Sequence, residues 1–252
     1  MGLICTLASG SSGNAVLIGY KSTYLLVDAG ISAKRIKNAL WELGISELSC
    51  VLVTHEHGDH TSGLAVLRKD VYAAPYTAQA IRREAPALNI REITGEFNAG
   101  DIGVTPFATP HDTPDSLGYL LHLGGFRVCV CTDLGHVTKA VLDHASQADC
   151  LLIESNHDET MLRNGSYPAF IKKRILGPNG HLSNDASAEV TLAAARGGAR
   201  YVTLCHLSKD NNHPGIAKET ASRRLLENGI GVGRDVSLTV APRSAMGVPI
   251  RV

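Results

Sequence analysis

Short apolar runs that end in polar turns recur along the whole of this 252-residue chain. Such runs are typical of buried strands, whereas apolar residues spaced by three and four positions are typical of helices that pack on one face. Strands clustered in each half, with helices between them, suit two stacked sheets covered by helices on both outer faces. The runs predict strands near residues 3–8, 14–19, 23–28, 50–54, 102–108, 117–123, 126–132, 149–154, 200–205 and 235–240. The helical spacing predicts helices near residues 32–43, 137–144, 168–176, 185–196 and 214–227, and one beginning near Thr61.

The polar turn after the predicted strand 50–54 carries the most specific chemistry in the chain. It reads Thr-His-Glu-His-Gly-Asp-His and places four donors within six positions: His55, His57, Asp59 and His60. Neutral imidazole and carboxylate groups are the ligands that zinc and similar divalent cations accept. A turn can direct these side chains toward one point, so we interpret the segment as a metal-binding loop and not as a His-rich surface loop.

Further ligands are expected where other apolar strands run out into loops. His111 follows the run 104–110, Asp133 follows the run 126–132, and His206 follows the run 201–205. Function is commonly placed on such loops. Together with the loop 54–60 these residues supply seven donors, which is enough for two metal ions that share one carboxylate.

The His-x-His-x-Asp-His loop, followed by a lone His, a lone Asp and a late His, resembles the metallo-β-lactamase superfamily. Four other segments resemble its YycJ/WalJ/VicX-like group, and the likeness runs from about Leu3 to His213. These segments are Leu-Ala-Ser-Gly-Ser-Ser-Gly-Asn at 7–14, Leu-Val-Asp-Ala-Gly at 26–30, Glu-Ser-Asn-His-Asp at 154–158 and Gly-His-Leu-Ser-Asn at 180–184. The resemblance implies one α/β domain over residues 1–252, an αβ/βα four-layer sandwich.

The resemblance also implies a dinuclear site. His55, His57 and His111 would hold one divalent ion. The other ion would be held by Asp59, His60 and His206, with Asp133 bridging the two. Zinc, manganese and iron all suit this set, so the sequence does not select the native metal.

Other polar residues are assigned supporting roles. Asp28 is expected to orient an imidazole beneath the metal loop, although it is also a plausible turn residue before Gly30. Asp59 and His181 are predicted catalytic residues, with His181 the proton donor; a surface His beside a helix cap is the alternative. The substrate cleft is predicted to include Ser11, Asn14, Asn156, His157, Ser183 and Asn184. The loop that holds Ser11 would equally suit a plain hairpin turn.

Composition agrees with one compact cytoplasmic enzyme. Apolar residues make up 44% of the chain, and 24 basic residues balance 24 acidic ones. Neutrality argues against a general nucleic-acid coat protein but not against a local basic groove. No apolar run reaches the length of a membrane span, and no leader peptide is recognisable. The six cysteines lie in apolar runs and are predicted to be reduced core residues, Cys129 and Cys131 included.

The predicted activity is hydrolysis by a water molecule activated between two metal ions. Because the YycJ-like group is associated with 5′-to-3′ exonuclease activity, the leading hypothesis is a phosphodiesterase acting on DNA ends. A small-molecule hydrolase of cyclic phosphates or thioesters is the second hypothesis, favoured by neutral charge and few aromatic residues. A metal-stabilised regulatory protein without catalysis is the third, and the intact ligand set argues against it.

Overall fold

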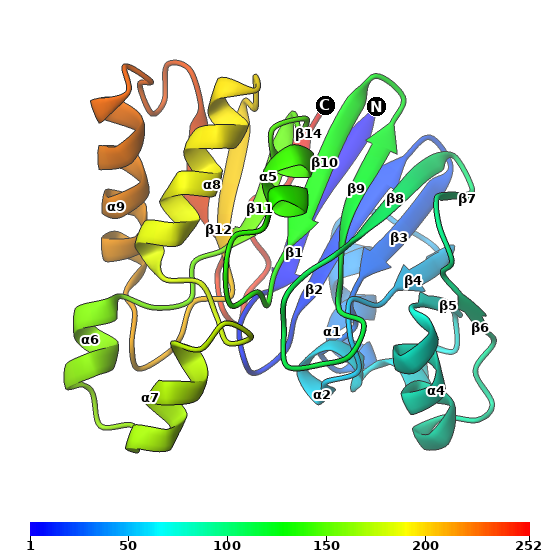
Figure 1. Ribbon diagram of the computed structural model, residues 1–252. Helices are drawn as coiled ribbons and strands as arrows, with labels where there is room; N and C mark the ends of the chain where they lie inside the picture. The colour runs from blue at the N-terminus through cyan, green and yellow to red at the C-terminus, as the bar shows by residue number, and fades with distance from the viewer.

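Two seven-stranded sheets pack face to face in the computed structural model, which describes residues 1–252, and helices cover both outer faces (Figure 1). The strand order is β14-β1-β2-β3-β4-β5-β6 in the first sheet and β13-β12-β11-β10-β9-β8-β7 in the second. This αβ/βα four-layer sandwich confirms the predicted fold class.

The elements follow one another in two similar halves. The first half contains β1 (Gly2–Ala8), β2 (Ala15–Tyr20), β3 (Thr23–Val27), α1 (Ala33–Glu42), β4 (Cys50–Leu52), α2 (Gly58–Thr61), α3 (Leu64–Leu67), β5 (Asp70–Ala73), α4 (Pro75–Glu84), β6 (Ile90–Glu92) and β7 (Phe97–Ala99). The second half contains β8 (Ile102–Ala108), β9 (Leu117–Leu123), β10 (Phe126–Cys131), α5 (Lys139–Ala145), β11 (Cys150–Glu154), α6 (Glu159–Asn164), α7 (Ala169–Ile175), α8 (Asn184–Arg196), β12 (Tyr201–Cys205), α9 (Pro214–Glu227), β13 (Ser237–Val240) and β14 (Ile250–Arg251).

The apolar residues form three core layers, as a four-layer sandwich requires. One lies between the two sheets and includes Leu25 and Val130. A second lies between the first sheet and its helices, where Ile36 and Leu40 of α1 are buried as their spacing predicts. The third lies between the second sheet and α5, α8 and α9. Since both faces of each sheet are covered, the central strands are apolar throughout.

Parallel pairing determines where the loops meet. Strands β3 to β6 run parallel to one another, and so do β10 to β13. The carboxyl ends of parallel strands share one edge of a sheet, which is where α/β sheets commonly bind ligands. The loops after β3, β4, β10, β11 and β12 therefore open on the same edge of the sandwich.

The structure corrects the prediction of a helix beginning near Thr61. Helix α2 begins earlier, at Gly58, and a separate helix α3 follows at Leu64. The break falls at Gly63, whose nitrogen donates to Ala29 O, and a Cβ at Gly63 would lie 2.4 Å from Ile31 O. The backbone therefore turns closely against residues 29–31 instead of continuing as one helix. Elements β5, α4, β6, β7, α6 and β14 have no counterpart among the predicted elements.

All six cysteines are buried and free, as predicted. Burial raises the pKa of the Cys129 thiol to about 12, as expected of an apolar core residue. None of the helices combines the length and apolar character needed to cross a lipid bilayer.

Candidate metal centre

The polar side chains at the carboxyl edge come from strand ends that are far apart in sequence. Asp28 follows β3, His55 follows β4, Asp133 follows β10 and His206 follows β12. Asp28, Asp133 and His206 all adopt positive φ, at 63°, 58° and 54° respectively. Non-glycine residues adopt this left-handed conformation rarely and at a cost of about 1–3 kcal/mol. The backbone therefore bends sharply where these three side chains enter the centre.

The metal loop is held by backbone contacts as well as by its own turn. Asn14 N donates to Asp59 O and Gly30 N donates to Asn14 O, each over 2.8 Å. An added Cβ at Gly30 would lie 1.6 Å from Asp59 O, so only glycine permits this approach. The loop 9–14 therefore packs directly on the start of α2.

Hydrogen bonds to the Nδ1 atoms fix the orientation of four imidazoles. His55 Nδ1 lies 3.0 Å from Thr54 Oγ1, and His60 Nδ1 lies 2.8 Å from Asp28 Oδ2. His111 Nδ1 lies 3.2 Å from Gly180 O, and His206 Nδ1 lies 2.8 Å from Glu154 Oε1. With Nδ1 held by these partners, Nε2 is the ring atom of each imidazole that remains for a metal.

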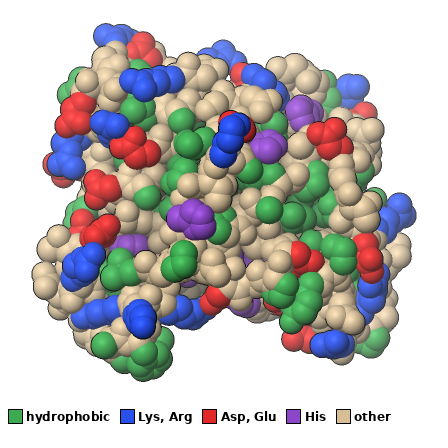
Figure 2. Space-filling view, viewed as in Figure 1, with side chains coloured by type: hydrophobic (Ala, Val, Ile, Leu, Met, Phe, Trp, Pro, Cys, Tyr) green, Lys and Arg blue, Asp and Glu red, His purple; other side chains and the backbone are tan.

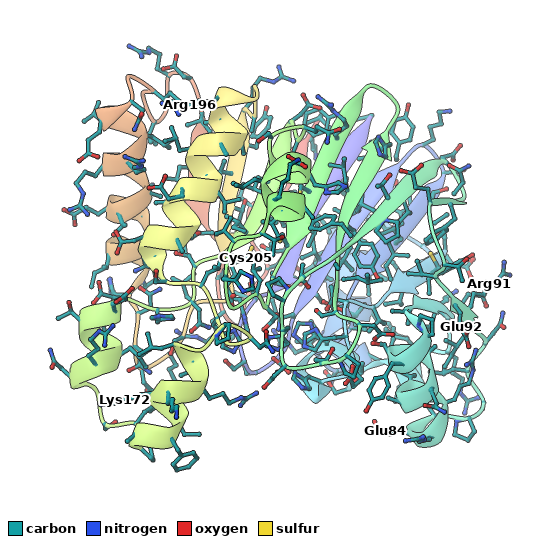
Figure 3. All side chains as sticks on the ribbon, in the orientation of Figure 1. Glu84, Arg91, Glu92, Lys172, Arg196 and Cys205 are labelled. Carbon is teal, nitrogen blue, oxygen red and sulfur yellow. The ribbon has the colours of Figure 1, made fainter.

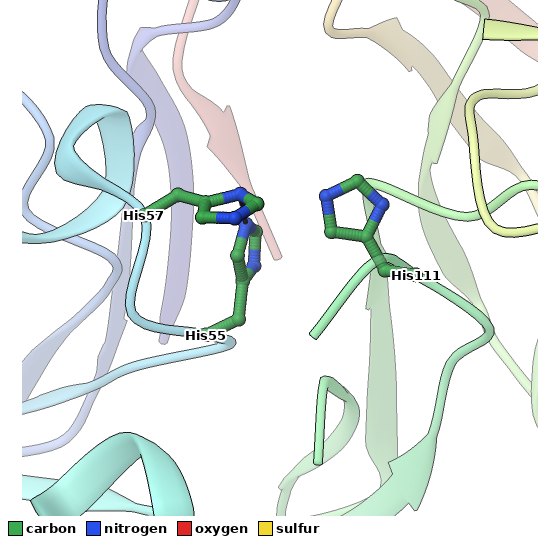
Figure 4. A group of neighbouring side chains, drawn as sticks. All are labelled: His55, His57 and His111. Atoms are coloured by element: carbon green, nitrogen blue, oxygen red, sulfur yellow. Dashed lines mark hydrogen bonds between the residues drawn. The ribbon is translucent and has the colours of Figure 1, made fainter. Parts of the chain in front are cut away.

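One donor cluster consists of His55, His57 and His111, whose ligand atoms lie within 4.8 Å of one another. His55 and His57 come from one loop and His111 faces them from the opposite side (Figure 4). His55 Nε2 and His57 Nδ1 are 3.1 Å apart. Donors around a tetrahedral zinc at roughly 2.1 Å are about 3.4 Å apart, so these imidazoles suit one cation.

A second set of donors consists of Asp59, His60 and His206. His60 Nε2 lies 3.6 Å from Asp59 Oδ2, and His206 Nε2 lies 3.9 Å from the same oxygen. The buried atoms His206 Nε2 and Asp133 Oδ2 have no hydrogen-bond partner. Buried polar atoms without partners are costly, and a divalent cation would satisfy both. The residues present therefore fit a metal.

Asp133 belongs to two clusters of possible metal ligands. Its carboxylate groups with His55 and His60 in one cluster, and with Glu154, His181 and His206 in the other. Its Oδ2 is 3.2 Å from His60 Nε2. Although burial opposes ionisation, the imidazoles of His206 and His60 hold the pKa of Asp133 well below its usual range. Asp133 is therefore an anionic carboxylate placed between the clusters.

Glu154, at the end of β11, is a functional residue that the sequence analysis did not single out. It is fully buried, and its Oε1 lies 2.8 Å from Nδ1 of both His181 and His206. Its Oε2 accepts hydrogen bonds from Leu134 N and Leu182 N. Burial acts against the charge, yet the adjacent His181 lowers the pKa of Glu154 to about 2. Glu154 is thus a fixed anion that orients two imidazoles.

His181 lies beside the donors and differs from them in exposure. Its Nδ1 is 3.6 Å from Asp133 Oδ1, and its side chain is 19% exposed, whereas that of His206 is 2% exposed. Burial alone would lower the pKa of His181, but the Glu154 carboxylate raises it. With Nδ1 bonded to Glu154, the Nε2 atom is free to donate a proton.

Comparison with known proteins identifies the family. Residues 23–207 match the family described as "Beta-lactamase superfamily domain", a range that contains every donor above. An exodeoxyribonuclease YycJ from Bacillus anthracis is 37% identical over 92% of this chain and 93% of its own. An exodeoxyribonuclease WalJ from Streptococcus pneumoniae strain D39 is 36% identical over 91% of this chain and 90% of its own. The chain belongs to the metallo-β-lactamase superfamily. Membership makes it a metal-dependent hydrolase.

Solved structures of the superfamily share the fold. The metallo-β-lactamase fold protein YhfI from Bacillus subtilis superposes with a TM-score of 0.72 over the full length of both chains, at 14% identity. PqqB from Methylobacterium extorquens superposes with a TM-score of 0.68 at 18% identity. At these identities the likeness concerns the fold alone.

The residues predicted to line a substrate cleft fall into different environments. Ser11 is exposed, and Asn14 lies within 3.4 Å of Asp59 Oδ2 through its Nδ2. Asn156 and Asn184 are buried, and their side chains are hydrogen-bonded within the protein. Asn156 Nδ2 donates to His206 O, so this side chain holds the His206 loop and does not line a cleft.

Of the other two predicted cleft residues, Ser183 is half-buried and His157 is buried. Ser183 caps α8 by accepting a hydrogen bond from Ala186 N, as its position before the helix predicts. His157 is buried and neither of its ring nitrogens has a partner. Burial lowers the pKa of His157, so it is a neutral interior side chain.

Asp28 has the orienting role that was predicted for it as one of two alternatives. It accepts hydrogen bonds from Thr54 N, Thr54 Oγ1 and His60 Nδ1. Replacement by Asn should keep the left-handed backbone, which Asn tolerates, but remove the anion that orients His60. We expect metal affinity to fall about 10–100-fold, measured by competition with a chromogenic chelator. An unchanged affinity in a folded Asp28→Asn protein would show that the contact is only structural.

Proposed function

We propose that this metallo-hydrolase is a deoxyribonuclease that binds two divalent cations and degrades DNA from its ends in the 5′-to-3′ direction. The observation that carries the proposal is the convergence of seven His and Asp donors at one edge of the sandwich, with the Asp133 carboxylate shared by two donor clusters. The DNA substrate is supported by the two relatives above, each named an exodeoxyribonuclease and each matched over more than nine-tenths of this chain. Reduced buried cysteines agree with a cytoplasmic location, which is part of the proposal.

We infer that two cations would divide these donor residues between them. His55, His57 and His111 would hold one, Asp59, His60 and His206 would hold the other, and Asp133 would contact both. Bound cations in such sites acidify water and neutralise charge that develops on phosphoryl oxygens. All seven donors are nitrogen or oxygen, with no thiolate among them, so manganese, zinc and iron are the candidate metals.

The chain supplies the proton that the leaving group needs. Hydrolysis breaks a P–O bond, adds the oxygen of water to phosphorus and leaves an alkoxide that must be protonated. His181 holds its Nδ1 proton on Glu154, and although burial opposes the charge, this carboxylate raises the pKa of the ring and so favours its protonated form. It would therefore transfer the Nε2 proton to the leaving oxygen. The products are a phosphomonoester and an alcohol.

The test is digestion of DNA strands that carry a label at one end. Single- and double-stranded DNA with 5′-phosphate or 5′-hydroxyl ends should be degraded in millimolar manganese or zinc. A 5′ label should be released at once in small products, whereas a 3′ label should remain on shortening strands. Asp59→Ala serves as the control for contaminating nucleases. If no metal-dependent cleavage of any of these strands occurs, the proposal is wrong.

A small phosphodiester or thioester is the alternative substrate. The formal net charge of zero and the low aromatic content of 5% favour a compact ligand over a long polyanion. Rapid turnover of a chromogenic bis-aryl phosphodiester that is unaffected by excess DNA would favour this alternative. Competitive inhibition by DNA would favour the nuclease.

The contact between Glu154 and His181 predicts a change in the pH profile. The acid form of His181 is required, so kcat should fall as pH rises through the pKa of this group. Glu154→Gln removes the charge that raises this pKa, and burial then lowers it. We therefore expect the alkaline limb of the kcat profile to move to lower pH. Metal content should be measured in parallel, because Glu154 also contacts His206.

A further inference from the structure

Helix α7 is unusual because it buries none of its own side chains. It lies with α6 in a lobe below α8 and α9, at the lower left of Figure 1. Phe170, on this helix, is 71% exposed. Most helical stability comes from packing an apolar face against the protein, and in α7 the apolar residues Ile171 and Ile175 are only half-buried. Its exposed surface is therefore available to a ligand.

Direct contacts connect α7 to the metal centre. Arg174 pairs with Asp112 Oδ2 at 2.6 Å, and Asp112 Oδ1 is 3.1 Å from His111 Nε2. Directly after the helix, His181 N donates to Ile175 O, and Gly180 O accepts from His111. The carboxyl end of α7 is therefore held within two contacts of a predicted metal ligand and immediately before the predicted proton donor.

The α7 lobe is basic in a chain whose formal charge is zero. Residues 159–180 include four basic side chains and a single acidic one, Glu159. Glu159 pairs with Arg163 and Asp112 pairs with Arg174, so neither neutralises the two lysines of α7. Lys and Arg side chains gather over this lobe in Figure 2, and Figure 3 labels Lys172 on α7. The positive charge that no acidic side chain of this lobe neutralises is therefore that of Lys172 and Lys173.

An aromatic ring and an ammonium group share one face of α7. Phe170 and Lys173 are three positions apart, a spacing that makes them neighbours on a helix. Both side chains are exposed. Exposed aromatic rings stack on unpaired bases of any sequence, and adjacent cationic groups contact phosphates. A membrane-binding helix would instead present several large apolar residues on one face.

We propose that Phe170, Lys172 and Lys173, here called the α7 patch, bind a single-stranded stretch of the DNA next to the phosphate being cleaved. Phe170 stacks on an unpaired base, and the two lysines contact the phosphates beside it. The inference rests on the proposed nuclease function, and it adds the location of the bound DNA strand on the protein. It would also give a chain of zero formal charge a local group of basic side chains with which to hold a polyanion.

The test measures binding separately from cleavage. A 20-nucleotide single strand with a 3′ fluorophore is titrated in EDTA, with fluorescence anisotropy as the readout. Phe170→Ala should weaken binding about fivefold or more. Lys172→Gln with Lys173→Gln should lower the slope of log affinity against log salt by about 1.4, since each single-strand phosphate contact contributes about 0.7. The matched control removes two exposed basic residues of α9, Lys218→Gln with Arg223→Gln, and should leave the slope unchanged.

Turnover then separates the two proposals. The α7 variants should slow DNA digestion far more than hydrolysis of a chromogenic nucleotide aryl ester, which is too short to reach α7. If the wild-type protein degrades DNA and the α7 variants bind and degrade it equally well, the α7 inference is wrong and the nuclease function stands. If the wild-type protein neither binds nor degrades DNA, both fail. A loss of affinity equal to that of the α9 control would also overturn the inference, because it would reflect net charge alone.

Discussion

Replacing Asp133 by Asn is expected to lower metal-dependent hydrolysis by about a thousandfold or more. Asp133 is a buried anion whose carboxylate belongs to two donor clusters, and its Oδ2 lies 3.2 Å from His60 Nε2. An amide of the same shape retains one oxygen but no charge, so cations bound on either side would lose shared neutralisation. Metal-assisted stabilisation is worth several kcal/mol, and about 4 kcal/mol corresponds to a factor of roughly a thousand. The measurement is kcat/KM with a 5′-phosphorylated strand.

Elemental analysis of the same variant provides the second readout. We expect Asp133→Asn to retain fewer equivalents of metal per chain than the wild type after gel filtration. The unfolding midpoint in EDTA shows whether the fold is intact, which separates loss of ligands from loss of structure. Full metal content together with activity within tenfold of the wild type would mean that Asp133 is not shared between cations.

Replacing His181 by Ala is expected to lower kcat on DNA by about a hundredfold to ten-thousandfold, the usual contribution of a positioned acid. His181 is held by Glu154 and is partly exposed at the centre, which suits a group that meets the substrate. The loss should appear in kcat because the proton is transferred only as the P–O bond breaks. Binding of the strand in EDTA should change little.

The leaving group decides whether His181 acts as the acid. A nitrophenyl ester of a nucleotide releases a stable phenolate that needs no proton, whereas DNA releases an alkoxide. His181→Ala should therefore impair hydrolysis of the nitrophenyl ester far less than hydrolysis of DNA. An equal loss on both substrates would exclude proton donation and assign His181 to positioning the site.

The fold class could be predicted from the sequence, and so could the convergence of most of the donor residues on one site. Apolar runs that ended in His or Asp marked the strand ends, and parallel pairing placed these ends on one edge. The strands of segment 70–99 were not predicted, because they have only three or four residues each and most of their side chains are not buried. Such short strands form by pairing with neighbours that are already in the sheet.

The roles that depend on contacts between distant segments could not be predicted from the sequence. Glu154 bonds with residues 27 and 52 positions away, so its role depends on distant contacts, and its only local signal is that it opens the segment 154–158 that resembles the YycJ-like group. Asn156 and Asn184 were predicted to line the cleft because they lie in the two segments, 154–158 and 180–184, that resemble the YycJ-like group. They prove to be buried, in a network with Ser155 and Asn212 that holds the loops.

The left-handed backbone at Asp28, Asp133 and His206 has a consequence for how the protein acquires its cofactor. The conformational cost at these strand ends is met when the sandwich folds, with its three apolar layers in place. An emptied centre should thus keep its shape, unlike a zinc finger, which collapses without its ion. Exchange of one cation for another then needs no refolding, and the metal found in the purified enzyme will follow the supply in the cell that made it.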